Sequence, residues 1–252
     1  MHKIISVHSF RGGTGKSNTT ANVATALAAQ GHKVGVVDTD IQSPGIHVLF
    51  GFDAATMEHS LNDYLWGKCE ITETAYDLSH SLGVDLTGKL YLIPSSIKAG
   101  EIARVVREGY DVGLLNDGFH DLIELLGLDV LLIDTHPGLN EETLLSIAVS
   151  DALAVILRPD QQDYQGTSVT VEVARKLDVP HMVLVVNKVP AVFDEEEVRE
   201  HVEQTYDCPV AAVIPHSEEM MTLASEDIFV LRYPKHPITA KFKHLADVLV
   251  EV

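Results

Sequence analysis

The chain has 252 residues, 46% of them hydrophobic and 22% charged, which is ample for the core of one large α/β domain or two small ones. Its formal net charge of -19 argues against a strongly basic surface for nucleic acid and favours solubility and a basic partner. No apolar run is long enough to span a bilayer, a strand begins without a preceding signal peptide, and Cys69 and Cys208 form no CxxC motif, so we expect a cytoplasmic protein.

Strands and helices alternate along the whole sequence. Short apolar runs rich in β-branched residues predict strands over residues 3–8, 33–38, 89–93, 129–134, 152–158, 181–187 and 210–214. Helical patterns lie between them, over residues 16–30, 98–108, 117–126, 141–149, 166–177, 194–205, 216–225 and 239–250. This alternation predicts an α/β fold with one doubly wound, mostly parallel sheet of about seven strands and helices on both faces. We expect a single domain over residues 1–252.

The sequence HSFRGGTGKSNTT at residues 8–20 joins the first predicted strand to the first predicted helix. Its glycines let the backbone fold tightly around phosphate oxygens, and the helix N-terminus adds a positive dipole end. In such a loop Lys16 contacts the β- and γ-phosphates and the Ser17 hydroxyl binds Mg²⁺. The expected nucleotide-binding residues of this loop are Gly12, Gly13, Thr14, Gly15, Lys16, Ser17 and Asn18.

Carboxylates follow two of the other predicted strands. Asp38 and Asp40 are two residues apart, so in an extended chain they point to the same side, where one can bind Mg²⁺ and the other can orient the attacking water. An acidic strand-to-loop turn is the alternative. Asp134 ends the apolar run DVLLID and has the position of a Walker B carboxylate that holds Mg²⁺. We expect His136, shortly after it, to face solvent rather than to act in catalysis.

The loop sequence RGGTGKS resembles the deviant Walker A box KGGxGK[ST] of the MinD/ParA family. Phe10 stands where an ordinary Walker A box has its first glycine. Arg11 takes the place of the lysine that, in this family, reaches across a dimer to the partner's nucleotide. The resemblance thus implies a catalytic role for Arg11 beside Lys16 and Asp40, although a contact within its own chain and a simple surface charge remain alternatives. It also assigns Asp40 to the water and places Asp38 nearer the metal.

The resemblance extends to the base-binding region. The strand sequence MVLVVNKVP ends in Asn187, and the asparagine at this position of the family reads adenine. An amide offers a donor and an acceptor, which suits the N6 and N7 edge of adenine. Pro190 replaces the aspartate of the guanine-reading NKxD motif, which favours ATP over GTP. The segment that begins at Pro215 is similar to the family's loop and helix that close over adenine.

The family resemblance implies a slow, partner-stimulated ATPase that requires ATP and Mg²⁺, forms a homodimer when ATP is bound, and acts as a spatial-positioning or partitioning switch through an activating or adaptor protein. Two alternatives are a nucleotide-binding scaffold that has lost hydrolysis and a metal- or cofactor-insertion ATPase. Cluster-carrying members generally present paired cysteines, which this chain lacks. Net charge does not favour a DNA or membrane surface.

Two C-terminal features bear on such surfaces. The last predicted helix carries Phe242, Leu245 and Leu249 on one face, which favours packing in the core over binding to a membrane. A local basic cluster suits either contact with a nucleic-acid backbone or a solvated helix entry, and the sequence does not decide between them. Its members are Arg232, Lys235, Lys241 and Lys243.

Overall fold

The computed structural model describes residues 2–223 and 225–251. Within these residues, eight strands form one sheet in the order β3-β4-β2-β5-β1-β6-β7-β8. Neighbouring strands run parallel, except that β3 pairs with β4 in the antiparallel direction. The predicted mostly parallel sheet is therefore confirmed. The strands are β1 (Lys3–His8), β2 (Lys33–Asp38), β3 (Tyr76–Asp77), β4 (Lys89–Ile93), β5 (Val130–Asp134), β6 (Ala152–Leu157), β7 (His181–Val189) and β8 (Val210–Pro215).

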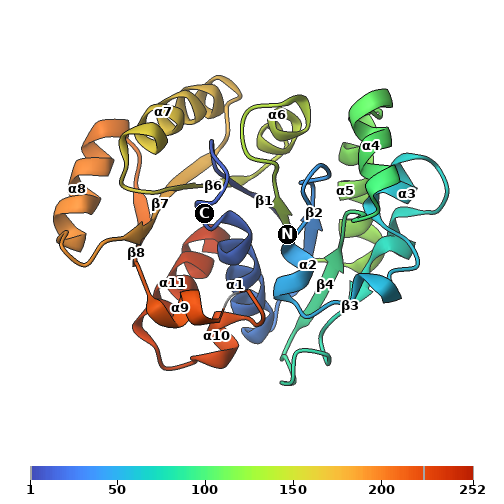
Figure 1. Ribbon diagram of the computed structural model, residues 1–252, viewed down its shortest axis with the longest axis horizontal. Helices are drawn as coiled ribbons and strands as arrows, with labels where there is room; N and C mark the ends of the chain where they lie inside the picture. Colours follow the sequence, from blue (N-terminus) through green and yellow to red (C-terminus); the bar gives the residue numbers. More distant parts are fainter. Residues whose placement is uncertain (1, 224, 252) are drawn as a thin grey trace.

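Helices cover both faces of the sheet (Figure 1). One face carries α1 (Lys16–Ala29) and α11 (Pro237–Glu251), which lie side by side. The opposite face carries α4 (Ala99–Glu108), α5 (Gly113–Leu126), α6 (Glu141–Ala148), α7 (Gln161–Lys176) and α8 (Glu195–Tyr206). Short helical segments complete the chain: α2 (Ile46–Leu49), η1 (Ala54–Thr56), α3 (Leu61–Leu65), η2 (Ile71–Thr74), α9 (Glu218–Thr222) and α10 (Phe229–Arg232).

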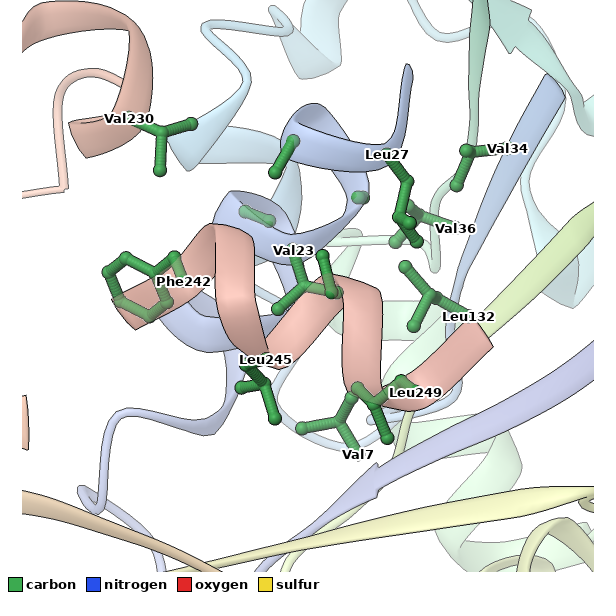
Figure 2. Packing of buried hydrophobic residues seen from close by; sticks show 14 of the residues in the cluster. Val7, Val23, Leu27, Val34, Val36, Leu132, Val230, Phe242, Leu245 and Leu249 are labelled. Carbon is green, nitrogen blue, oxygen red and sulfur yellow. The ribbon is translucent and has the colours of Figure 1, made fainter. Parts of the chain in front are cut away.

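Side-chain alternation along the strands places a hydrophobic core on each face of the sheet, and the core beneath α4 to α8 is divided into two clusters. In β2, Val36 packs into the core beneath α1 and α11, whereas the next residue, Val37, packs into the core beneath α5. Figure 2 shows Phe242, Leu245 and Leu249 of α11 lying against α1 and the sheet. Each of these three residues is at most 1% exposed, so the prediction that the last helix packs in the core is confirmed. Among the described residues, none of the helices has both the length and the apolar character that crossing a membrane would require.

The predicted strands agree with the observed ones to within two residues, whereas several helix boundaries differ. The helix predicted over residues 166–177 begins at Gln161, because Asp160 caps it by accepting hydrogen bonds from the backbone N–H groups of residues 162 and 163. The helix predicted over residues 117–126 begins at Gly113. The strand β3 and the short helical segments other than α9 were not predicted, because two to five residues are too few to show a periodic pattern. The helix predicted over residues 216–225 is observed only as α9, and residue 224 lies outside the described residues.

Candidate nucleotide-binding site

Residues 9–15 connect β1 to α1 and form the loop that the sequence predicts to bind phosphate. Gly13 and Gly15 have φ angles of 79° and 97°, in the left-handed region that favours glycine. A Cβ atom on Gly15 would also lie 2.3 Å from Nδ2 of Asn187 in β7. The Thr14 hydroxyl is buried and has no hydrogen-bond partner among the described residues, as expected where a ligand completes a site. The loop therefore has the backbone geometry of a phosphate cradle.

Phe10, which replaces the first glycine of an ordinary Walker A box, packs against α7. A Cβ atom added to Gly166 of this helix would lie 2.2 Å from Cδ1 of Phe10 and 2.8 Å from its Cβ. The aromatic ring thus fills the space that the missing side chain of Gly166 leaves. Phe10 is therefore compatible with an intact loop, because the larger residue at position 10 is matched by the smallest residue at position 166.

Lys16 begins α1, and its side chain is only 7% exposed. Its Nζ atom lies 2.8 Å from Oδ1 of Asp134 and 3.5 Å from Oγ of Ser17. One turn later in the same helix, the Thr20 hydroxyl donates to the same Asp134 oxygen at 2.9 Å. The structure therefore brings together Lys16, Ser17 and Asp134, the three residues that the sequence motifs single out.

Asp38 ends β2 and Asp134 ends β5, and the two residues are in register across these neighbouring strands. Their side chains are buried, and the two carboxylate oxygens of Asp38 accept hydrogen bonds from the backbone N–H groups of Asp40 and Gly45. Burial and the nearby Asp134 raise the pKa of Asp38, because two carboxylates in a buried site repel each other. A divalent cation would offset this repulsion, and Ser17 adds a third oxygen of the kind that Mg²⁺ prefers. The residues present thus fit Mg²⁺.

Asp40 contacts His136 across the site. Nδ1 of His136 lies 2.6 Å from Oδ1 of Asp40, and the two side chains are 24% and 13% exposed. The expectation that His136 faces solvent is therefore wrong. The loop after β5 turns the imidazole toward the loop after β2, an arrangement that sequence spacing does not show.

Asn187 fixes the phosphate loop from β7. Its Nδ2 atom donates to the carbonyl oxygen of Thr14 at 2.8 Å, and its Oδ1 accepts from the backbone N–H of Lys188 at 2.9 Å. One N–H and one lone pair of the amide remain for a base. Lys188 has a φ of 58°, in the left-handed region, and its Nζ donates to the carbonyl oxygen of Gly13 at 2.8 Å.

Two adjoining cavities surround these side chains. One of about 310 Å³ is lined by the phosphate loop, and one of about 460 Å³ extends from the loop toward β7, β8 and α9. Residues of both cavities include Gly15, Asn18, Lys188 and Ser225. The predicted residues that line the smaller cavity are Gly12, Gly13, Gly15, Lys16, Ser17, Asn18 and Asp40. The larger cavity adds Asn187 and Pro215.

Sequence reasoning did not single out several residues that line the larger cavity, namely Lys188, His216, Ser217, Met220, Met221 and Ser225, although all but Lys188 lie in the segment expected to close over adenine. Most of them belong to the segment that follows β8, and the likeness of that segment to a base-covering loop was the available signal. Lys188 directly follows the asparagine that the sequence singles out, but nothing in the sequence indicates its left-handed backbone conformation.

His8, at the end of β1, lies behind the phosphate loop. It is fully buried, and its Nδ1 lies 2.8 Å from the hydroxyl oxygen of Thr135. That hydroxyl donates to the carbonyl oxygen of Val7, so Nδ1 of His8 carries the proton and donates. Burial, followed by the charges of Lys16 and His136, lowers the pKa of His8 to about 3. The imidazole is therefore neutral at ordinary pH.

Arg11 forms ion pairs within its own chain. Its Nη1 atom lies 3.2 Å from Oδ1 of Asp163 and 3.7 Å from Oδ1 of Asp160, at the N-terminus of α7. Asp163 also accepts a hydrogen bond from Nε of Arg158 at 2.9 Å. The Arg11 side chain is 39% exposed, but because of these ion pairs it is not a free surface charge in this structure. Its proposed reach into a partner subunit stays a prediction.

The family of the chain follows from comparison with known proteins. The family model ParA, described as NUBPL iron-transfer P-loop NTPase, matches residues 1–250. The chain belongs to the ParA family of P-loop NTPases. This assignment agrees with the strand–loop–helix geometry around Lys16 and with the parallel sheet.

Proteins similar to this chain have differing descriptions. An uncharacterized ATP-binding protein of Methanocaldococcus jannaschii is 28% identical over 247 residues, which are 98% of this chain and 87% of that protein. An iron-sulfur cluster carrier protein of Pyrococcus horikoshii is 27% identical over 192 residues, 73% of this chain and 60% of its own length. The structure of the septum site-determining protein MinD of Pyrococcus horikoshii, complexed with Mg-ADP, superimposes with a TM-score of 0.82 at 23% identity, covering 98% of this chain and 96% of that one. The last comparison shows that the fold is shared.

Proposed function

We propose that this ParA-family protein is a Mg²⁺- and ATP-dependent ATPase that dimerises when ATP is bound and acts as a positioning or partitioning switch through a partner protein. The observation that carries the proposal is the cluster of Lys16, Ser17, Asp38 and Asp134 beside a cavity that continues to Asn187. A cytoplasmic location and a single domain remain predictions.

Each residue of the cluster has a definite task in this proposal. Lys16 exchanges its ion pair with Asp134 for the β- and γ-phosphates, and the loop N–H groups hold the phosphate oxygens. Ser17, Asp38 and Asp134 would hold Mg²⁺, which would supply positive charge to offset that of the phosphates. Asp40 orients a water molecule whose oxygen bonds to the γ-phosphorus while the bond to the bridging oxygen breaks, giving ADP and phosphate.

The base cavity supports ATP as the nucleotide. The free N–H and lone pair of Asn187 suit the donor–acceptor edge of adenine, and Met220 and Met221 offer apolar surface to the ring. We therefore expect competition binding to show a clear preference for ATP over GTP. Equal affinity for the two nucleotides would contradict the role of Asn187.

Cluster carriage is the competing function, because one relative is described as an iron-sulfur cluster carrier and the family model as iron-transfer. The two cysteines do not favour it. Burial raises the pKa of both Cys69 and Cys208 to about 11, and Cys208 is placed to donate from Sγ to the carbonyl oxygen of Met182. A thiolate, which is the form that binds iron, is therefore disfavoured at either position.

The basic cluster near α11 gives limited support to a nucleic-acid partner. Lys241 pairs with Glu195 of α8, so its charge is already compensated within the chain. A protein partner with a basic surface fits the net charge of -19 better.

Measurements of ATP binding and hydrolysis on purified wild-type protein and on Lys16→Ala and Asp40→Ala variants test the proposal. Lys16→Ala is expected to weaken ATP binding by about 10- to 100-fold, the equivalent of about 1.5–3 kcal/mol for a charged hydrogen bond. Asp40→Ala is expected to keep ATP binding and to lose hydrolysis. Lys176→Ala, which removes an exposed lysine of α7, is the matched control and should change neither quantity.

Equal hydrolysis by wild type and Asp40→Ala would contradict the catalytic assignment. ATP binding without hydrolysis by the wild type would favour a nucleotide-binding scaffold. Stoichiometric binding of iron by the purified wild-type protein, with no ATP-dependent dimer, would favour cluster carriage instead.

A further inference from the structure

The carboxylate of Asp40 is held asymmetrically. Its Oδ1 atom accepts three hydrogen bonds, from Nδ1 of His136 at 2.6 Å, from Oγ of Ser43 at 2.9 Å and from the backbone N–H of Ser43 at 3.2 Å. Within the part of the chain that the structure describes, Oδ2 accepts none. Asp40 lines the cavity of the phosphate loop, so Oδ2 is the oxygen with which it can hold a water molecule there.

His136 is the donor that ties Asp40 to another part of the fold. Ser43 follows Asp40 by three residues and moves with the same loop, whereas His136 follows β5. The backbone of His136 is itself fixed, because its carbonyl oxygen accepts from the hydroxyl of Thr143, a buried residue of α6. The imidazole therefore projects from an anchored segment onto the loop that carries Asp40.

We propose that His136 is a positioning residue for Asp40: its Nδ1–H group holds Oδ1 and thereby turns Oδ2 toward the attacking water. This inference rests on the proposed ATPase function. Hydrolysis depends steeply on how the water is placed, because small displacements of a positioning group reduce the rate by as much as about 100-fold. The contact with His136 acts on this step and not on nucleotide affinity, since the base and the phosphates are held by other residues.

Three substitutions of His136 separate this role from a structural one. His136→Asn places an amide nitrogen close to where Nδ1 lies and can still donate to Asp40. His136→Gln places its amide near the position of Nε2, and His136→Ala removes the donor. We expect kcat for ATP hydrolysis to fall by about 10- to 100-fold in the alanine and glutamine variants and to recover to within about threefold of wild type in the asparagine variant.

KM and the dissociation constant for ATP are expected to stay within about threefold of wild type in all three variants. His120→Ala, which removes an exposed histidine of α5, is the control and should leave kcat and KM unchanged. An unchanged kcat in His136→Ala would overturn the inference. Equal recovery by glutamine and asparagine would also overturn it, because the donor would then not be the Nδ1 position.

A second measurement needs neither nucleotide nor activity. Urea unfolding midpoints of the ligand-free wild type, His136→Ala, Asp40→Ala and the double variant report whether the two side chains are coupled. We expect the midpoint shift of the double variant to be smaller than the sum of the two single shifts, and additive shifts would overturn the contact.

The two measurements also keep this inference separate from the proposed function. If Asp40→Ala abolishes hydrolysis while His136→Ala does not lower kcat, the ATPase proposal stands and the role of His136 falls. If the wild type does not hydrolyse ATP, both proposals fail, even if the urea midpoints show coupling.

Discussion

The contact between Phe10 and Gly166 allows a sharp test of the phosphate-loop design. Gly166→Ala adds one methyl group inside α7, at a point where its carbon would lie 2.2 Å from Cδ1, 2.5 Å from Cγ and 2.8 Å from Cβ of Phe10. Rotating the ring does not relieve the last contact, because the position of Cβ is set by the backbone of the loop. Either the loop or the helix has to move.

The expected cost follows from two opposing terms. Overpacking a well-filled site typically costs about 1–3 kcal/mol. Alanine is more favourable than glycine inside a helix by about 1 kcal/mol. Because the contacts in this site are well below van der Waals distance, we expect the first term to dominate and Gly166→Ala to reduce the free energy of unfolding by about 1–2 kcal/mol. For a chain of this length the melting temperature should then fall by about 2–8 °C.

Thermal and urea unfolding of the ligand-free protein measure the change, and a second substitution decides its cause. In a Phe10→Gly background the added methyl group meets no ring, so Gly166→Ala should become stabilising by up to about 1 kcal/mol. Gly100→Ala in α4 is the matched control, because a Cβ atom there has no neighbour within 4 Å. Equal destabilisation by Gly166→Ala in both backgrounds would refute the reasoning.

Three further predictions concern charges. Arg11→Ala should weaken an ATP-dependent dimer, measured by sedimentation velocity, more than it weakens ATP binding, and Arg11→Lys should restore much of the dimer. An unaltered dimer in the alanine variant would contradict the proposed contact of Arg11 with the nucleotide of the partner subunit. Because His8 has a pKa of about 3 when folded and about 6.5 when unfolded, only the unfolded chain binds the extra proton between these pH values. The free energy of unfolding should therefore fall by about 1.4 kcal/mol for each unit by which the pH is lowered from about 6.5 to about 3, and His8→Thr should reduce this loss. Burial raises the pKa of Asp63, but hydrogen bonds from Lys68 and Ser60 outweigh it and lower the pKa below its ordinary value. The ionised carboxylate therefore stabilises the fold above the unfolded pKa of about 3.9, and this contribution is lost as pH falls through the folded pKa. Asp63→Asn should destabilise the protein at pH 7 and much less at about pH 2.

The sequence predicts the sheet and the phosphate loop well because the signals for both are local. Buried parallel strands are continuous apolar runs, and the glycines of the loop act through neighbouring backbone atoms. The carboxylates Asp38 and Asp134 were identified because they directly follow such runs, at the edge of the sheet where ligands bind.

Contacts between distant segments were not predictable in the same way. His136 meets Asp40 across 96 residues, and Arg11 meets Asp163 across 152 residues. Each pairing depends on how separate strand ends are arranged in the folded sheet, which no spacing in one sequence specifies. The matching of Phe10 with Gly166 is of the same kind, since neither residue alone indicates its partner.

If Asn187 reads the base as proposed, its hydrogen bond to the loop links base selection to phosphate affinity. The same amide that faces the larger cavity supports the carbonyl of Thr14, and Gly15 has no room for a side chain beside it. A substitution that changes the preferred base would therefore also loosen the loop that binds the triphosphate. On this proposal, a single mutation would not easily change the preferred nucleotide, and a change of nucleotide during evolution would require coordinated replacements in β7 and in the loop.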